Sequence, residues 1–299
     1  MMTIKGFIIK ALSSFYYVEA QNIIYECKAR GNFRKNGFSP LVGDKVEIEV
    51  LDSSHGVINR IYDRKNALKR PNVANVDKLF IVSSYTTPSP NTLIIDKITA
   101  IARYNNIEPI IVFNKADIGD FSDYKNIYES SGFKTYVISA RNGEGMNGLL
   151  DELKDCVSVF TGNSGVGKSS ILNYLFGNKN IATGEVSDKL GRGRHTTRHI
   201  EAYKLENSGY VIDTPGFSSI EYDNSDYNFK ENLAECFYDF GERIYNCKFS
   251  SCTHTKENGC CVIEAVKNGE IEVTRHNSYI EIFNELKDLK AWQILKKTK

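Results

Sequence analysis

The spacing of hydrophobic positions divides the chain into three regions, and the first of them predicts β-structure. Up to residue 68, short apolar runs are separated by glycines, and residues 44–50 alternate between polar and apolar side chains. Such runs are typical of short, half-buried β-strands. We place these strands at 6–9, 15–18, 23–27 and 44–50. Their spacing favours a small barrel of the five-stranded oligonucleotide-binding (OB) type.

From about residue 70 to 220, apolar strands alternate with helical stretches. This alternation is typical of a mostly parallel sheet covered by helices. Strands are predicted at 78–82, 109–113, 134–138, 158–160 and 210–212. Beyond about 221 the chain becomes polar and cysteine-rich, and then helical. The pattern therefore predicts a multidomain α/β protein with three domains, at 1–68, 69–220 and 221–299.

A phosphate-binding sequence directly follows the strand predicted at 158–160. Residues 162–169 read G-N-S-G-V-G-K-S, which matches G-x-x-x-x-G-K-[ST]. In such a loop the glycines let backbone N–H groups cradle phosphate oxygens, and the next helix points its positive end at the anion. We expect Lys168 to reach the β- and γ-phosphates and Ser169 to bind Mg²⁺. The predicted phosphate-binding set is Gly162, Asn163, Ser164, Gly165, Val166, Gly167, Lys168, Ser169 and Ser170.

A base-reading sequence, Asn114-Lys115-Ala116-Asp117, follows the strand predicted at 109–113. The Asp117 carboxylate can accept hydrogens from N1 and from the exocyclic amine of guanine, whereas adenine offers neither donor. A buried carboxylate left unpaired is costly, so such a site rejects ATP. We expect Asn114 to support N7 and the stem of Lys115 to lie over the base.

Ser139-Ala140 follows the strand predicted at 134–138. The backbone N–H groups of this loop are expected to meet O6 of guanine. The pair is uninformative alone, but it is a further motif at the carboxyl end of a strand, where open α/β sheets bind ligands. We therefore assign Ser139 and Ala140 to the guanine site.

Asp213-Thr214-Pro215-Gly216 follows the strand predicted at 210–212. Asp213 is expected to hold Mg²⁺ through water, and the Gly216 N–H to meet the γ-phosphate. The next residue is Phe217, where Ras-like GTPases carry the glutamine that orients the attacking water. Since phenylalanine has no polar group, intrinsic hydrolysis should be slow and dependent on a partner.

Residues 191–198, between the phosphate loop and Asp213, are rich in glycine and charge. They suit a mobile switch, and a solvated basic loop is the alternative. Either Thr196 or Thr197 is expected to complete the magnesium shell; the sequence does not decide between them, and we carry Thr197 forward. His195 is a local candidate for orienting the water, and a switch histidine with no catalytic role is the alternative.

The order of these motifs is rotated relative to ordinary small GTPases, in which the phosphate loop comes first. Here the base-reading motifs precede it, and the motif ending at Gly216 comes last. A helix predicted at 147–155 runs directly into the strand that precedes the phosphate loop, so the usual termini are fused. The second domain is therefore predicted to be a circularly permuted P-loop GTPase. Its second switch would lead into the C-terminal segment and could pass nucleotide state to it.

A metal site is predicted in the cysteine-rich segment. Cys247-x₄-Cys252-x-His254-x₅-Cys260 offers three thiolates and one imidazole, a closed set suited to one structural zinc ion. Cys261 is adjacent and is an alternative to Cys260. Zinc would order a segment too polar to build its own core, within a mostly α-helical domain. The tail at 285–299 is either an RNA-facing helix or an amphipathic packing helix.

Composition restricts the setting of the protein. The cysteines are odd in number (seven), no signal peptide is evident, and the longest apolar runs are too short to cross a bilayer. We expect a monomeric cytoplasmic protein with no membrane partner. The net charge of +1 excludes a uniformly basic nucleic-acid binder. Local basic clusters suited to phosphate backbones lie at Arg60, Arg64, Lys65, Lys69 and Arg70, and at Arg192, Arg194 and Arg198.

With these motifs, the chain resembles the bacterial ribosome small subunit-dependent GTPase A family over almost its full length. The resemblance is carried by Asn114–Asp117, Gly162–Ser170, Asp213–Gly216 and the Cys247/Cys252/His254/Cys260 spacing. It implies a GTP phosphohydrolase acting in late maturation of the small (30S) ribosomal subunit. Such a protein binds the subunit and its rRNA with GTP, hydrolyses GTP to GDP and phosphate when the subunit stimulates it, and is then released.

Two other functions fit parts of the pattern. One is an ATP-using P-loop enzyme, against which Asp117 argues. The other is a GTP-regulated RNA-binding module in which hydrolysis is incidental. Multiple-turnover phosphate release in the presence of small subunits would exclude that second alternative.

Overall fold

The computed structural model describes residues 2–31, 33, 39–69, 71–85, 89–177, 200–213 and 227–287. The chain divides into two compact units. One contains Met1–Phe80 and Met146–Ser218, and the other contains Ile81–Gly145 and Ser219–Lys299. Strand β8 (Lys78–Ser84) begins in the first unit and ends in the second. Among the described helices, none is long and apolar enough to cross a membrane.

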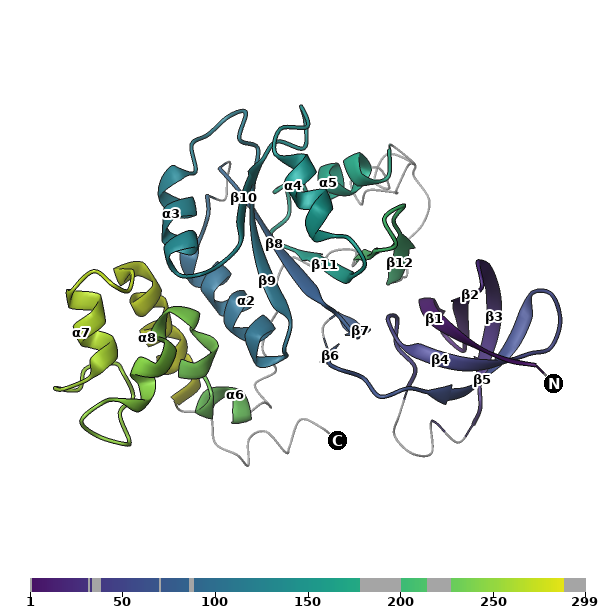
Figure 1. The fold of residues 1–299 in the computed structure, drawn as a ribbon, viewed down its shortest axis with the longest axis horizontal. Coiled ribbons are helices and arrows are strands. Elements are labelled where there is room, and N and C mark those ends of the chain that lie inside the picture. The colour runs from purple at the N-terminus through teal and green to yellow at the C-terminus, as the bar shows by residue number, and fades with distance from the viewer. Residues whose placement is uncertain are drawn as a thin grey trace, which may run out of the picture. The chain divides into compact units, whose positions relative to one another are not determined.

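The first five strands form a closed barrel, as the sequence predicts (purple and blue arrows in Figure 1). They are β1 (Thr3–Leu12), β2 (Phe15–Ala20), β3 (Ile23–Ala29), β4 (Lys45–Val50) and β5 (His55–Ile61). The ring runs β1-β2-β3-β5-β4 and closes because β4 also pairs with β1. Only the β3–β5 contact is parallel. The inward positions are apolar, with Ile8, Val18 and Ile48 fully buried. The fifth strand had no prediction of its own.

The chain leaves the barrel through a short ribbon of β6 (Ala67–Lys69) and β7 (Asn72–Ala74). Gly43 lies against this ribbon with a φ of +95°, and a Cβ there would be 2.0 Å from the Ala74 carbonyl oxygen. Only glycine tolerates both constraints. Next to it, the buried Asp44 carboxylate accepts hydrogen bonds from Arg64 at 2.7 and 2.8 Å. These contacts fix the exit of the barrel.

The rest of the first unit is α/β. It contains α4 (Met146–Glu152), β11 (Val157–Thr161), α5 (Lys168–Leu175), β12 (Glu201–Lys204) and β13 (Tyr210–Asp213). Strands β11 and β13 are parallel, while the short β12, which the sequence analysis missed, runs antiparallel to β13. At its other edge β12 pairs with β1 of the barrel, at Lys10 and Glu201. An ion pair of 2.8 Å joins the same two residues.

The second unit combines the base-reading segment with the C-terminal segment. It holds α2 (Thr92–Tyr104), β9 (Glu108–Asn114), α3 (Ser122–Ser130) and β10 (Thr135–Ile138), then α6 (Tyr227–Glu231), the 3₁₀ helices η2 (Ala234–Cys236) and η3 (Tyr238–Tyr245), α7 (Cys261–Lys267) and α8 (Val273–Lys287). Strands β9 and β10 are parallel. In the described part of the tail helix, Leu286 is buried, which favours packing there.

A buried ion cluster joins α2 to the C-terminal helices inside this unit. The Arg275 guanidinium is fully buried and donates to Asp96 at 2.5 Å and to Asp239 at 2.9 and 3.2 Å. The rings of Phe133 and Phe237 flank it, with centroids 4.9 and 4.6 Å from the guanidinium carbon. A buried charge needs such partners because desolvation is costly. The cluster therefore fixes α8 against α2.

Candidate nucleotide site and metal centre

The phosphate loop connects β11 to α5 in the first unit. Gly162, Gly165 and Gly167 have φ angles of +144°, +81° and +94°, a region that favours glycine. Val166 is buried and anchors the loop. Helix α5 begins at Lys168, so its unpaired N–H groups and positive dipole end lie next to the loop. The local conformation is that of an anion-binding loop.

Lys168 lies over this loop and is held by it. Its ammonium donates to the carbonyl oxygen of Gly162 at 2.5 Å and to that of Asn163 at 2.9 Å. Burial lowers the pKa of Lys168, while the charge of Asp213 acts in the opposite direction. The lysine and the first residue of the predicted magnesium motif are thus electrostatic neighbours. The side chains of Ser169 and Ser170 are exposed and accessible to a ligand.

The base-reading residues form a hydrogen-bonded network in the second unit. Asn114 ends β9, is 2% exposed, and accepts the Ala140 N–H at 3.1 Å. The Ser139 hydroxyl donates to Asp117 Oδ1 at 2.7 Å. Lys115 adopts a left-handed φ of +69°, which turns the chain between Asn114 and Asp117. The two predicted motifs are therefore joined through their own side chains.

One detail of this network differs from the simple expectation. The Ala140 N–H, which we expected to face guanine O6, donates to Asn114 in this structure. The Ala116 N–H likewise donates to the Ile138 carbonyl at 3.0 Å. Both bonds hold the loop after β10 against the loop after β9.

Several predicted residues lie outside the described ranges. These are Arg192, Arg194, His195, Thr196, Thr197, Arg198, Gly216 and Phe217, with Arg70 and the tail beyond 287. Of the basic residues at 60–70, Arg64 and Lys65 form ion pairs with Asp44 and Asp77. These two cations are engaged within the protein, which weakens their prediction as a phosphate-binding cluster.

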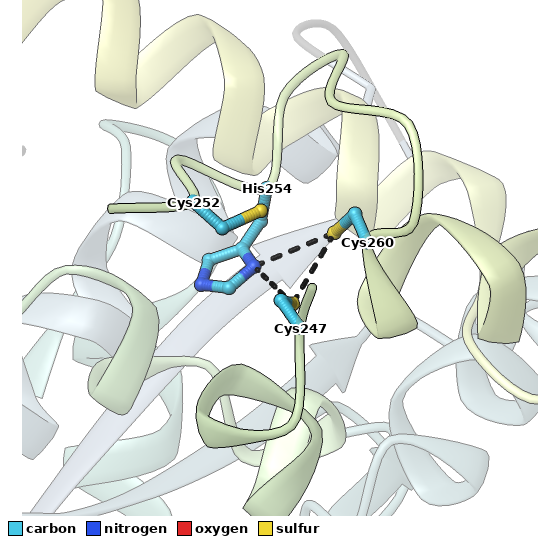
Figure 2. Close-up of side chains that lie close together, drawn as sticks. All are labelled: Cys247, Cys252, His254 and Cys260. Carbon is cyan, nitrogen blue, oxygen red and sulfur yellow. Dashed lines mark hydrogen bonds between the residues drawn. The ribbon is translucent and has the colours of Figure 1, made fainter. Parts of the chain in front are cut away.

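The four predicted metal ligands come together in the C-terminal segment, and Figure 2 shows their side chains facing one another. Cys247, Cys252, His254 and Cys260 place their ligand atoms within 4.8 Å of one another. The Cys247 and Cys260 sulfurs are 3.8 Å apart, and each lies 3.5 Å from His254 Nδ1. A tetrahedral zinc ion with bonds of about 2.0–2.3 Å separates its ligand atoms by about 3.5–3.8 Å. The cluster fits such an ion.

The protonation chemistry and the neighbours of the cluster agree with a cation site. Burial lowers the pKa of His254 and favours the neutral imidazole that ligates metals. Burial raises the pKa of Cys252 to about 12, so a bound cation must displace its proton. Cys261 is not a member of this group of four; its N–H donates to Cys247 Sγ at 3.4 Å and its thiol to the Asn246 carbonyl at 3.0 Å.

Residues that support the metal loop escaped the sequence analysis. The Glu257 carboxylate accepts the Thr253 N–H at 3.0 Å, and the Tyr279 hydroxyl donates to the Thr253 carbonyl at 2.9 Å. His276 Nε2 lies 2.7 Å from the His254 carbonyl oxygen. The only signal for His276 and Tyr279 is their spacing of one helical turn on α8, which many packing residues share.

The described loops and the metal cluster, in this chain order, define a GTPase of the circularly permuted class. The sequence model of the RsgA GTPase family matches residues 61–223, and that of the RsgA N-terminal domain matches residues 5–58. The chain belongs to the RsgA family and is a GTP hydrolase.

Relatives and solved structures agree over nearly the whole chain. The small ribosomal subunit biogenesis GTPase RsgA of Caldanaerobacter subterraneus is 44% identical over 96% of this chain and 97% of its own length. The protein of the same name from Alkaliphilus metalliredigens is 42% identical over 95% of this chain and 98% of its own. The crystal structure of YjeQ from Thermotoga maritima is 34% identical, with a TM-score of 0.80, covering 97% of this chain and 100% of that one. YloQ, described as a circularly permuted GTPase, is 33% identical, with a TM-score of 0.76, covering 97% and 96%.

Proposed function

We propose that this protein acts in late maturation of the small ribosomal subunit. It binds the subunit and its rRNA with GTP, hydrolyses GTP when the subunit stimulates it, and is released with GDP. The observation that carries the proposal is the near-complete coverage of relatives named small ribosomal subunit biogenesis GTPase, at 42–44% identity. The phosphate loop and the base-reading network agree with it.

The roles of the site residues are part of this proposal. Residues 162–170 bind the phosphates, and Asn114, Lys115, Ala116, Asp117, Ser139 and Ala140 bind guanine. The Lys168 ammonium already lies over the loop through its bonds to Gly162 and Asn163, so phosphate oxygens replace these carbonyls as its partners. Ser169, Asp213 and Thr197 are the residues that would hold Mg²⁺, with Thr196 as the alternative to Thr197. When bound, this cation offsets the charge that develops on the phosphates.

Hydrolysis proceeds by in-line attack of water on the γ-phosphate, with the Gly216 N–H meeting that group. Phe217 cannot orient the water, because it has no polar atom. We infer that the small subunit completes or stabilises the catalytic arrangement. GTP is therefore hydrolysed at an appreciable rate only when the protein is correctly bound to the subunit. This explains why a weak intrinsic enzyme serves as an assembly factor.

The Cys247/Cys252/His254/Cys260 cluster holds one structural zinc ion in this proposal. Four protein ligands fill a tetrahedral shell and leave no position for substrate. The metal orders the loop from 247 to 260, in which no described residue belongs to an α-helix or β-strand. Its role is to present the C-terminal segment as a rigid surface.

The remaining assignments follow from the same function. The three domains are 1–68, 69–220 and 221–299, and the barrel and the zinc domain bind rRNA. The protein works in the cytoplasm, as a monomer. The nucleotide acts through the switch after Asp213, which leads directly into the zinc domain.

Co-sedimentation with purified small subunits tests the proposal. We expect the full-length protein to pellet with subunits in a non-hydrolysable GTP analogue and to stay in the supernatant in GDP. A Lys168→Ala variant should lose this difference between nucleotides. Equal pelleting of the unaltered protein in both nucleotides would refute the release step, and no pelleting in either would refute the partner.

A further inference from the structure

The first unit contains a cavity that no residue of the phosphate loop lines. It has a volume of about 520 Å³ and is bounded by β1, the β2–β3 turn and the start of β4 on the barrel side. Strands β12 and β13 close its other side. Ligand sites of small molecules occupy about 300–1,000 Å³. The residues that decide its chemistry are Lys5, Phe7, Lys45, Tyr62, Lys204 and Tyr210.

Three aromatic rings line this cavity. Phe7 and Tyr210 contact each other with centroids 4.4 Å apart and planes tilted by 30°. Tyr62 lies beyond the end of β5 and contributes the third ring. All three are half-buried, so each ring keeps part of its surface exposed. Half-exposed rings of this kind offer stacking surfaces to planar aromatic groups.

The lysines come from both sides of the cavity. Phe7 pairs with Lys45 in the register of β1 and β4, and Lys5 lies two residues before Phe7. Side chains two residues apart on a strand share a face, so Lys5, Phe7 and Lys45 form one surface. The Lys5 ammonium is 5.7 Å from the centroid of the Tyr62 ring. Cations and rings therefore alternate across the barrel wall.

The acidic groups nearby leave this surface positive. Glu19 accepts the Tyr210 hydroxyl at 3.0 Å and forms an ion pair with Lys204, so these two charges cancel. Glu47 on β4 lies opposite Lys5 of β1 and opposite Arg60 of β5. The basic side chains here are Lys5, Lys45, Arg60 and Lys204, and the acidic ones are Glu19 and Glu47, so the net charge of this surface is positive.

We propose that this cavity binds a nucleotide, with its base against the aromatic rings and its phosphate on Lys5 and Lys45. Aromatic rings bind any base through its π-face, and lysines bind phosphate oxygens without reading sequence. The one carboxylate among its lining residues, Glu19, already accepts the Tyr210 hydroxyl and pairs with Lys204, so the cavity should not select guanine. The nucleotide is either free in solution or one unit of a single-stranded RNA. The proposal uses none of the GTP-site residues, and only its RNA case rests on the proposed binding of rRNA by the barrel.

Binding to the full-length protein tests this proposal when the GTP site is first saturated with GDP and Mg²⁺. The probes are adenosine monophosphate and a uridine hexanucleotide, whose bases the guanine site should reject. Titration calorimetry should detect saturable binding of at least one probe. Binding of both assigns the cavity to nucleotides in general, whereas binding of the hexanucleotide alone assigns it to an RNA strand.

Variants connect that binding to the cavity. The double variant Lys5→Ala/Lys45→Ala should lower the affinity for the probe about tenfold or more, and Tyr62→Leu should lower that affinity by a similar factor. Lys28→Ala is the matched control, because Lys28 lies over the Phe15 ring at 5.1 Å and does not line the cavity. Unchanged GDP binding in every variant verifies folding. Failure of both probes to bind the unaltered protein at millimolar concentration, or equal weakening by the Lys28 control, overturns the proposal.

Discussion

The Ser139 hydroxyl donates a 2.7 Å hydrogen bond to the Asp117 carboxylate, across 22 residues of sequence. The bond joins the loop after β10 to the loop after β9 and orients the group expected to read guanine. The second carboxylate oxygen faces the exposed Arg141 at 3.8 Å. A carboxylate oriented in advance loses little freedom when a base binds, which favours affinity.

Replacing Asp117 by asparagine should change the base that the protein prefers. The amide offers one acceptor and one donor where guanine requires two acceptors, so GTP affinity should fall roughly 100-fold or more. Xanthine carries an oxygen in place of the exocyclic amine and should bind the variant better. Competition between GTP and xanthosine triphosphate measures this exchange. Asp120→Asn is the control, because Asp120 binds the Ser122 N–H at 2.9 Å, and it should leave the preference unchanged.

Lys168→Ala should remove most triphosphate binding and turnover. The ammonium is the only side-chain cation we assign to the β- and γ-phosphates, and its loss should cost about 2–4 kcal/mol of transition-state stabilisation. Steady-state phosphate release with small subunits measures the loss. Lys154→Ala removes an exposed lysine after α4 and should keep normal rates. Wild-type turnover in Lys168→Ala would show that the phosphate site is misassigned.

The metal cluster predicts opposite outcomes for neighbouring cysteines. Cys252→Ser should reduce bound zinc from about one ion per chain to a small fraction, and should lower the melting temperature. Cys261→Ser should keep the metal, because Cys261 is not a member of the group of four. Elemental analysis after dialysis measures both. Loss of zinc in Cys261→Ser with retention in Cys260→Ser would reverse the assignment of the fourth ligand.

The buried cluster at Arg275 should dominate the stability of the contact between α2 and α8. Arg275→Met leaves Asp96 and Asp239 buried without their cation, which should cost about 3–5 kcal/mol. Arg243→Met is the matched control, since its pair with Glu270 has side chains 40% and 49% exposed and should contribute no more than about 1 kcal/mol. Urea unfolding followed by helical circular dichroism compares the two. Equal effects would mean that the cluster is not needed for stability.

The motif-bearing loops were predictable because their chemistry fixes residue types at fixed spacing. Glycines at 162 and 167 are required by positive φ angles. The four metal ligands predicted between Cys247 and Cys260 form a compact cluster in the structure. The barrel followed from short apolar runs separated by glycines, and its five-strand closure was confirmed. These features are encoded locally.

Features that depend on distant partners were not predictable. Asp96 and Arg275 are 179 residues apart, and neither carries a local signal of burial. Strand β12 has only four residues and is defined by its neighbours on both sides. Arg64 counted as a free cation in the sequence, whereas in the fold it is paired with Asp44. Charge counting along a chain does not show which charges pair in space.

Phosphate release measured over many turnovers, with and without purified small subunits, tests the proposed function most directly. Because Phe217 provides no group to orient the water, we expect slow hydrolysis by the free protein and at least a tenfold faster rate (about 1.4 kcal/mol lower barrier) with subunits. Large ribosomal subunits are the control and should give less stimulation. Equal rates with and without small subunits would contradict a GTPase governed by that partner.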